Sequence, residues 1–131
     1  LTCKHAGRIM LAQGKGKIIN ISSVRGFQGR SEDLAYSPSK GAVNQLTKSL
    51  AIEWGPKGIN VNALAPSFIL TEISRPVLDD PRKREWVLSR SPMGRIGERR
   101  DMFGPAVFLA SDASDFVNGH VLLVDGGWTI A

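Results

Sequence analysis

The chain has 131 residues, of which 42% are hydrophobic and 22% are charged, and it contains a single cysteine, Cys3. These values are ordinary for one globular domain. A lone cysteine excludes an internal disulfide framework and favours a reducing compartment, so we expect a cytoplasmic protein. No apolar segment is long enough to span a membrane, and the first residues do not resemble a secretory signal, so we expect no membrane partner.

The net charge of +5 does not by itself indicate a nucleic-acid partner. The positive residues are spread along the chain, and the two local clusters, at 82–84 and 99–100, lie beside acidic residues. No aromatic residues alternate with them, as a surface that stacks bases would require. The two histidines, His5 and His120, are far apart, and no cluster has the spacing of metal ligands. We therefore expect neither nucleic acid nor a metal ion.

The chain begins with a pattern that predicts a helix and then a strand. Residues 4–13 resemble the end of an amphipathic helix, and the glycines at 14 and 16 interrupt it. Residues 17–21 are an apolar, β-branched run that suits a buried parallel strand. Residues 22–33, with glycines at 26 and 29, are expected to form a loop.

A long helix is predicted over residues 34–54. The side chains at 31–33 supply capping groups, and Pro38 falls in the first turn, where a missing amide donor is tolerated. Apolar residues recur at helical spacing, so we expect one inward face. Its members are Ala42, Val43, Leu46, Leu50 and Trp54.

Two further strands are predicted in the second half of the chain, at 59–65 and 121–124, and Pro66 ends the first of them. Between them, residues 67–84 form a long, proline-rich irregular stretch of the kind that often serves as a lid. A short helix is expected at 81–88. A longer one is expected at 98–111, with inward residues Met102, Ala106, Val107, Leu109 and Ala110.

Strands that alternate with helices predict an α/β fold with a parallel sheet and right-handed crossovers. Ligands of such sheets bind beyond the carboxyl ends of the strands. The serines at 22 and 23 follow the first strand, residues 66–71 follow the second, and Tyr36 and Lys40 open the intervening helix. Topology alone therefore brings these residues to one edge of the sheet.

Tyr36 and Lys40 are four residues apart and so lie on one face of the predicted helix. A lysine ammonium beside a phenol stabilises the phenolate, because an opposite charge favours the ionised form. The pair is then suited to general acid–base catalysis. A hydroxyl at Ser23 would hold a substrate oxygen while Tyr36 moves its proton.

Several segments together resemble the short-chain dehydrogenase/reductase family. They are Gly16-Lys-Ile-Ile-Asn-Ile-Ser-Ser23, Tyr36-Ser-Pro-Ser-Lys40, Asn60-Val-Asn-Ala-Leu-Ala-Pro66 and Asn118-Gly-His-Val-Leu-Leu-Val-Asp-Gly-Gly127. The resemblance covers essentially the whole chain but only the second half of the family's domain. It implies that residues 1–131 are a partial NAD(P)-binding Rossmann-like domain, the C-terminal half of a doubly wound parallel sheet with three strands side by side.

The resemblance also implies roles for individual residues. Ser23 would orient the substrate oxygen, Tyr36 would exchange the proton, and Lys40 would assist Tyr36 and bind the ribose of NAD or NADP. The family's loop after the second strand holds the nicotinamide, which assigns cofactor contacts to Pro66, to the Ile69 backbone and to the Thr71 hydroxyl. Ser67 stands where the family usually has glycine, which allows backbone shapes that serine disfavours.

The sequence of the second half of the chain resembles sugar-acid members of the family, such as the gluconate 5-dehydrogenases. It implies an oxidoreductase acting on a small carbonyl or alcohol substrate such as gluconate. Arg75 on the lid, and secondarily Arg25, is a candidate for binding a substrate carboxylate. A 3-oxoacyl-carrier-protein reductase is an alternative. Another is a non-catalytic interaction or assembly module, since the family's helix equivalent to residues 34–54 packs against a partner in a homo-oligomer.

Parts of the family's machinery have no match here. These are the Gly-rich phosphate turn, the residues that select NAD or NADP, and a catalytic asparagine in the preceding helix. The chain also lacks an initiator methionine. We therefore expect a fragment that is inactive alone, with a bare edge on the strand at 17–21.

Overall fold

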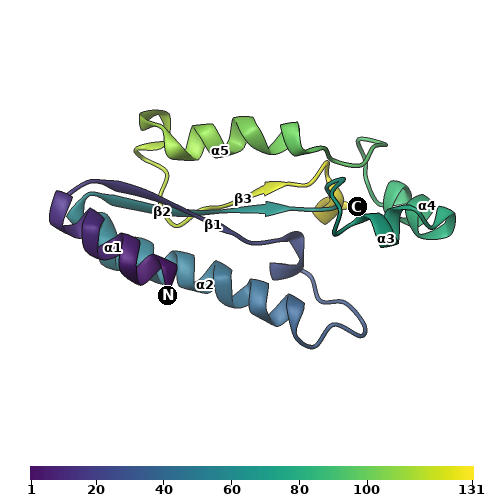
Figure 1. Cartoon of the computed structure of the whole chain (residues 1–131), viewed down its shortest axis with the longest axis horizontal. Helices are drawn as coiled ribbons and strands as arrows, with labels where there is room; N and C mark the ends of the chain where they lie inside the picture. Colours follow the sequence, from purple (N-terminus) through teal and green to yellow (C-terminus); the bar gives the residue numbers. More distant parts are fainter.

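The computed structural model describes residues 1–131 as one parallel sheet flanked by helices. The strands are β1 (Gly16–Ile21), β2 (Ile59–Pro66) and β3 (Val121–Val124), in the order β1-β2-β3. The helices are α1 (Thr2–Gln13), α2 (Tyr36–Trp54), α3 (Arg75–Leu78), α4 (Pro81–Ser89) and α5 (Phe103–Ala110). Helices α1 and α2 cover one face and α5 the other, while α3 and α4 lie beyond the carboxyl ends of the strands (Figure 1). The predicted α/β fold with three parallel strands is confirmed.

Strand β2 is the buried centre of the sheet. It pairs with β1 on one side and β3 on the other, and Val61, Ala63 and Ala65 have no exposed surface. The prediction that all three strands are buried is wrong for the outer two, since Ile21 is 60% exposed and Leu123 36%. An apolar run cannot distinguish a central strand from an edge strand. The outer edge of β1 has no paired strand, as expected.

The main apolar core lies between the sheet and the α1–α2 layer. Ile18 and Val61 of the sheet pack there against Ala51 and Trp54 of α2. Helix α1 approaches closely at Gly7, where an added methyl group would lie 2.5 Å from the Trp54 ring. A smaller cluster, formed by Ala63, Ala65 and Val121, joins β2 to β3. The core therefore fixes α2 firmly against the sheet.

The inward face of α2 is more polar than its sequence predicts. Ala42 and Leu46 are exposed, and Asn44 and Thr47 are buried instead. Thr47 accepts a hydrogen bond from Asn20 of β1 at 2.9 Å, and Asn44 bonds the loop after β1. Buried polar groups are stable when they are hydrogen-bonded, and these pairings override the apolar pattern. The helix begins at Tyr36 rather than at 34.

The connections in the second half also differ from prediction. The stretch predicted as irregular contains α3, and α4 is capped by Asp80, whose side chain accepts hydrogen bonds from two backbone amides. The predicted helix at 98–111 is a 3₁₀ turn (Arg99–Met102) followed by α5. Val107 and Ala110 are exposed and not inward, because the single short helix rests on the sheet mainly through buried Leu109.

Arg95 precedes α5 and has a structural role, in line with its predicted place in a connector. Its guanidinium donates to both carboxylate oxygens of Asp101, at 2.7 and 2.8 Å. These bonds, with one from the Glu98 amide, hold the pKa of Asp101 well below its usual range. The pair fixes the entry to α5.

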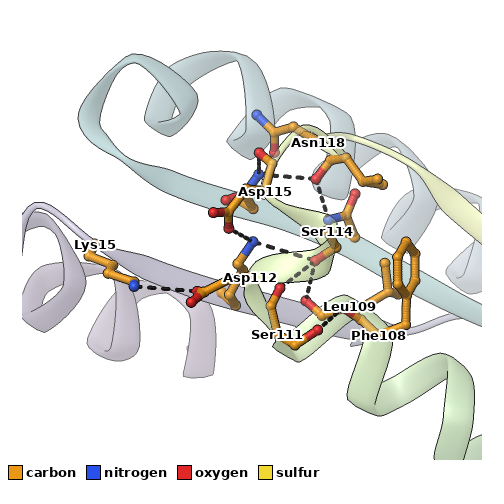
Figure 2. A network of polar contacts seen from close by, with 12 residues as sticks. Lys15, Phe108, Leu109, Ser111, Asp112, Ser114, Asp115 and Asn118 are labelled. Atoms are coloured by element: carbon orange, nitrogen blue, oxygen red, sulfur yellow. Dashed lines mark hydrogen bonds and ion pairs between the residues drawn. The ribbon is translucent and has the colours of Figure 1, made fainter.

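A polar network ties the chain together at the amino ends of the strands. Lys17 donates to the carboxylate of Asp115 at 2.6 Å, and Lys15 reaches Asp112 at 3.4 Å. Figure 2 shows these aspartates in the turn after α5, where Ser114 bonds the carbonyl of Leu109 at 3.1 Å. The Lys17 ammonium lowers the pKa of Asp115. This network is far from the strand ends expected to carry the site.

A lipid bilayer would require a longer and more apolar helix than any that the chain forms.

Candidate functional site

The carboxyl ends of the three strands are joined by side-chain hydrogen bonds to backbone. Ser23, two residues after β1, is buried, and its hydroxyl lies 3.5 Å from the carbonyl oxygen of Pro66 at the end of β2. The Ser67 hydroxyl in turn donates to the carbonyl of Asp125, directly after β3, at 3.0 Å. Ser67 also avoids the left-handed backbone region, so serine fits where the family usually has glycine. The predicted convergence at this edge is confirmed.

Tyr36 and Lys40 lie together in the first turns of α2. The Lys40 ammonium is 5.5 Å from the centre of the Tyr36 ring, and it donates to the carbonyl of Ile21 at 2.9 Å. The end of β1 therefore fixes the lysine beside the tyrosine. The Tyr36 ring is 50% exposed, and its hydroxyl has no hydrogen-bond partner in the chain. A half-exposed phenol without a partner is available to a bound molecule.

Asp33 holds the start of α2 in place. Its carboxylate accepts hydrogen bonds from the amides of Tyr36 and Ser37, at 3.0 and 3.3 Å, and from the Ser37 hydroxyl at 2.5 Å. The hydrogen bond from the Ser37 side chain is the main cause that lowers the pKa of Asp33, and the two amides lower it further. The predicted capping group of this helix is thus a carboxylate that also orients the turn bearing Tyr36.

Asn44 is a component that sequence reasoning did not identify. Its side-chain oxygen accepts a hydrogen bond from Ser22, and its amide donates to the carbonyl of Gly26 at 3.1 Å. The loop carrying Ser23 is thereby fastened to α2, the helix that carries Tyr36. Asn44 lies among apolar residues at helical spacing, and only its burial distinguishes it from an ordinary surface asparagine.

The loop after β2 is organised by Ser74, which was also not predicted. The Ser74 hydroxyl donates to the carbonyl of Ile69 at 2.7 Å and accepts a bond from the amide of Thr71 at 2.9 Å. The amide of Ile69 itself has no acceptor in the chain. A cavity of about 230 Å³ opens beside Ile69 and Ser67. The loop is therefore held in shape while one backbone donor stays available.

The side chain of Arg75 makes no contact with the predicted proton-transfer residues, although its amide donates to the carbonyl of Thr71 at 3.1 Å. Its guanidinium pairs with Glu72 at 3.6 Å, and both side chains are largely exposed. It makes no hydrogen bond with Ser23, Tyr36 or Lys40. The predicted carboxylate contact of Arg75 is not tested by this arrangement and stays a prediction.

Trp128 closes the site on the side of α4. It is 1% exposed and packs against Phe68 and Trp86, with ring centres 5.4 and 5.5 Å away. Asp125 folds the segment inward by accepting bonds from the amides of Gly127 and Thr129, at 3.0 and 2.9 Å. Burial alone would raise the pKa of Asp125, but these hydrogen bonds outweigh it and lower the pKa. Trp128 is thus a packing residue, while Trp86 stays 45% exposed at the edge of this cluster.

The arrangement places two hydroxyl groups and one ammonium at the edge where parallel sheets bind ligands. The Ser23 hydroxyl also accepts a hydrogen bond from the amide of Arg25 at 3.2 Å. The chain has no cluster of three or more histidine, cysteine or carboxylate side chains that would hold a metal ion. Proton transfer to or from a substrate oxygen is the chemistry that these groups support.

Comparisons with known proteins agree with this geometry. A family profile described as enoyl-(acyl carrier protein) reductase matches residues 1–129. The chain is 56% identical to the 2-dehydro-3-deoxy-D-gluconate 5-dehydrogenase of Bacillus subtilis over 94% of its length, covering 48% of that protein. It is 44% identical to the gluconate 5-dehydrogenase of Gluconobacter oxydans, with 95% and 48% coverage.

A solved structure has the same fold. The gluconate 5-dehydrogenase of Burkholderia cenocepacia, crystallised with NADP and tartrate, superposes with a TM-score of 0.96 at 46% identity. The alignment covers 98% of this chain and 51% of that one. The chain thus spans about half the length of the relatives it matches. With profile, relatives and fold in agreement, the chain belongs to the short-chain dehydrogenase/reductase family.

Proposed function

We propose that the whole protein is an NAD(P)-dependent oxidoreductase that moves a hydride between the nicotinamide and a carbonyl or alcohol substrate, with a sugar acid such as gluconate as that substrate. The observation that carries the proposal is the Lys40 ammonium, fixed by the Ile21 carbonyl beside a phenol whose hydroxyl has no partner. The sugar-acid substrates named for relatives in the comparisons support the substrate class.

Ser23, Tyr36 and Lys40 share the proton chemistry in this proposal. The Ser23 hydroxyl orients the substrate oxygen, and its burial limits the directions in which it can point. Tyr36 gives a proton to that oxygen in reduction and removes it in oxidation, as a general acid or base. Lys40 keeps its ammonium 5.5 Å from the centre of the Tyr36 ring. The hydrogen bonds of Asn44 and Asp33 hold the loop of Ser23 and the first turn of α2 in fixed positions.

The cofactor contacts are proposed for Tyr36, Lys40, Pro66, Ile69 and Thr71. The nicotinamide supplies or accepts the hydride, and the protein supplies orientation. The unpartnered amide of Ile69 fits a carboxamide oxygen, which needs a donor. NADP in a solved relative supports the choice of cofactor class. Neither NAD nor NADP is favoured by the residues of this chain.

An acyl-carrier-protein reductase is the second candidate, and the description of the matching family profile favours it. The two candidates differ in substrate, a free sugar acid against a thioester on a carrier protein. Parallel assays with gluconate and with a 3-oxoacyl thioester separate them. Turnover of the thioester alone would select the second candidate.

Homo-oligomer formation through α2 is part of the proposal for the whole protein. Leu46 and Ile52 on this helix are 47% and 78% exposed, which is unusual for large apolar side chains. A surface of this kind is suited to a second copy of the helix. It would equally serve a non-catalytic assembly module, and loss of all turnover in the intact protein would select that alternative.

The decisive variant is Tyr36→Phe in the intact gene product that contains this chain. Phenylalanine keeps the ring but removes the proton that the mechanism needs. We expect kcat to fall at least about 100-fold, since general acid–base catalysis contributes about 10² to 10⁴. Cofactor affinity, measured by fluorescence titration with NADPH, should stay near the wild-type value.

Ser49→Ala is the matched control, because Ser49 is an exposed hydroxyl on the same helix. Its kcat should equal that of the wild type. Turnover that survives in Tyr36→Phe would disprove the assigned role of the tyrosine. The 131-residue chain assayed alone should show no turnover, and activity in it would disprove the proposed need for the remaining half.

A further inference from the structure

We propose that Arg25, Arg30 and Arg90 form the subsite that receives the carboxylate of an acidic substrate. The three side chains line one pocket of about 500 Å³, together with Trp86 and the loop at 28–32. The inference deepens the proposed function and rests on it, because it names where a sugar acid would place its charged end.

The pocket carries more positive charge than its own residues neutralise. Three arginines line it against a single carboxylate, that of Glu32. None of the three arginines forms an ion pair within the chain, whereas Arg75, Arg95 and Arg100 each do. Burial is the main cause that lowers the pKa of Arg25; the charges of Arg30 and Arg90 lower it further, and Asp33 opposes them. A bound anion would relieve this repulsion.

The pocket is built on the loop that connects two of the predicted catalytic groups, although neither of them lines it. Its wall at 25–32 is the loop that begins two residues after Ser23 and ends shortly before Tyr36. Its other wall is the end of α4, through Trp86 and Arg90. A molecule with its alcohol carbon at Ser23 and Tyr36 would extend toward this loop. The charged end of a sugar acid would then meet the arginines.

Two of the guanidinium groups are already held in position. Arg25 and Arg90 lie 5.9 and 5.6 Å from the ring centre of Trp128, within the range of cation–π contact. Arg25 also donates to the carbonyl of Gly29 at 3.5 Å, and Arg90 to that of Ala131 at 3.3 Å. A planar guanidinium that is fixed in this way binds a carboxylate with little loss of freedom.

The experiment compares an acidic and a neutral substrate in the intact gene product. D-Gluconate and D-sorbitol share a six-carbon polyol chain, and only gluconate carries a carboxylate. In Arg25→Gln, Arg30→Gln and Arg90→Gln, we expect kcat/KM for gluconate to fall roughly 10- to 100-fold, mainly through KM, as for a lost charged hydrogen bond. The value for sorbitol should not change.

Arg84→Gln is the control, since Arg84 is exposed on the same helix as Trp86 and forms no ion pair. Arg30 is exposed and makes no cation–π contact with Trp128, so its variant tests the proposal even if changes at Trp128 impair folding. Equal losses with both substrates would indicate a structural role and overturn the proposal. A rise in KM for NADP but not for NAD would show that the arginines bind the extra phosphate of NADP and not a substrate carboxylate. That result would also overturn the proposal.

Failure of the subsite is distinguishable from failure of the proposed function. Gluconate binding is measured separately by calorimetry, with no turnover required. Binding that is present in the wild type and lost in the arginine variants supports the subsite even where the enzyme oxidises neither substrate. Normal turnover of gluconate in all three variants overturns the subsite and leaves the oxidoreductase proposal intact.

Discussion

Asp33 caps the first turn of α2, and this turn carries Tyr36, the proposed general acid or base. Three donors converge on one carboxylate, two of them backbone amides that an isolated helix would leave without partners. A negative charge at this end also complements the helix dipole. The position of the tyrosine therefore depends on the charge of a residue three places earlier.

The charge of Asp33 should make the stability of the chain depend on pH. Its pKa in the folded chain lies below the value of about 3.9 expected when unfolded, so the folded form binds the proton less tightly. The stabilisation is complete above about pH 4 and is lost as the pH falls through the folded pKa. We expect Asp33→Asn to unfold at lower urea concentration than wild type at neutral pH.

That difference should shrink as the pH falls below about 4, because the unfolded form then takes up a proton at Asp33 more readily than the folded form. Glu53→Gln on the same helix, which removes an exposed carboxylate with no hydrogen bonds, should behave like wild type at every pH. A gap between Asp33→Asn and wild type that does not vary with pH would show that the charge contributes nothing.

Helix α2 and the loop after β1 fit together at Gly26. An added methyl group there would lie 2.5 Å from the Asn44 amide and 2.9 Å from the carbonyl of Lys40. The second contact is with helix backbone, which cannot move aside as a flexible side chain would. The loop that carries Ser23 and the helix that carries Lys40 are thus in direct contact at this glycine.

Gly26→Ala should therefore push the loop away from α2. We expect a loss of about 1–3 kcal/mol in the free energy of unfolding, as is typical of overpacking. Gly29→Ala in the same loop is the matched control, since its methyl group would meet nothing within 4 Å. Chemical denaturation measures both. Equal stabilities of the two variants would refute the close contact.

At this scale the sequence predicts some features well and others poorly, for identifiable reasons. The spacing of Tyr36 and Lys40 follows from helix geometry alone, and the strand bounds follow from apolar runs. Asn44 could not be found, because its partners Ser22 and Gly26 are distant in sequence until the chain folds. Ser74 bonds groups only three to five residues away, but in a loop of irregular backbone whose shape no periodic pattern predicts. The inward face of α2 was mispredicted since periodicity recognises apolar residues and not hydrogen-bonded polar ones.

The whole molecule is a sheet with one fully paired strand and two open edges. β2 is paired on both sides, while β1 and β3 each have one free side. The amide of Gly16 in β1 donates to the carbonyl of Gly58, directly before β2, at 3.3 Å, and the amide of Ser22, directly after β1, donates to that of Leu64 in β2 at 2.7 Å. Alternate amides of a strand point to the same side, so those of Ile18 and Asn20 also face β2. The amides of Ile19 and Ile21 point the other way, toward the open edge.

Hydrogen exchange should follow this pattern across the molecule. We expect the amides of β2 to exchange most slowly, and those of β1 to alternate, slow at Ile18 and Asn20 and fast at Ile19 and Ile21. Heteronuclear NMR of the chain in deuterated water resolves each position. Uniformly slow exchange along β1 would mean that its edge is covered in solution, and dilution would tell whether a second copy covers it.

The strands lie side by side in the same order in which a ribosome would make them. Each strand can therefore dock on the one synthesised before it, with a helix closing each right-handed crossover. β2 meets β1 before β3 exists, so the Ser23 and Pro66 ends come together while about half of this chain is still to be translated. The last strand then completes the edge through Asp125 and brings Trp128 to the arginine pocket. Assembly during translation would thus build the proton-transfer groups first and add Trp128, the ring beside Arg25 and Arg90, last.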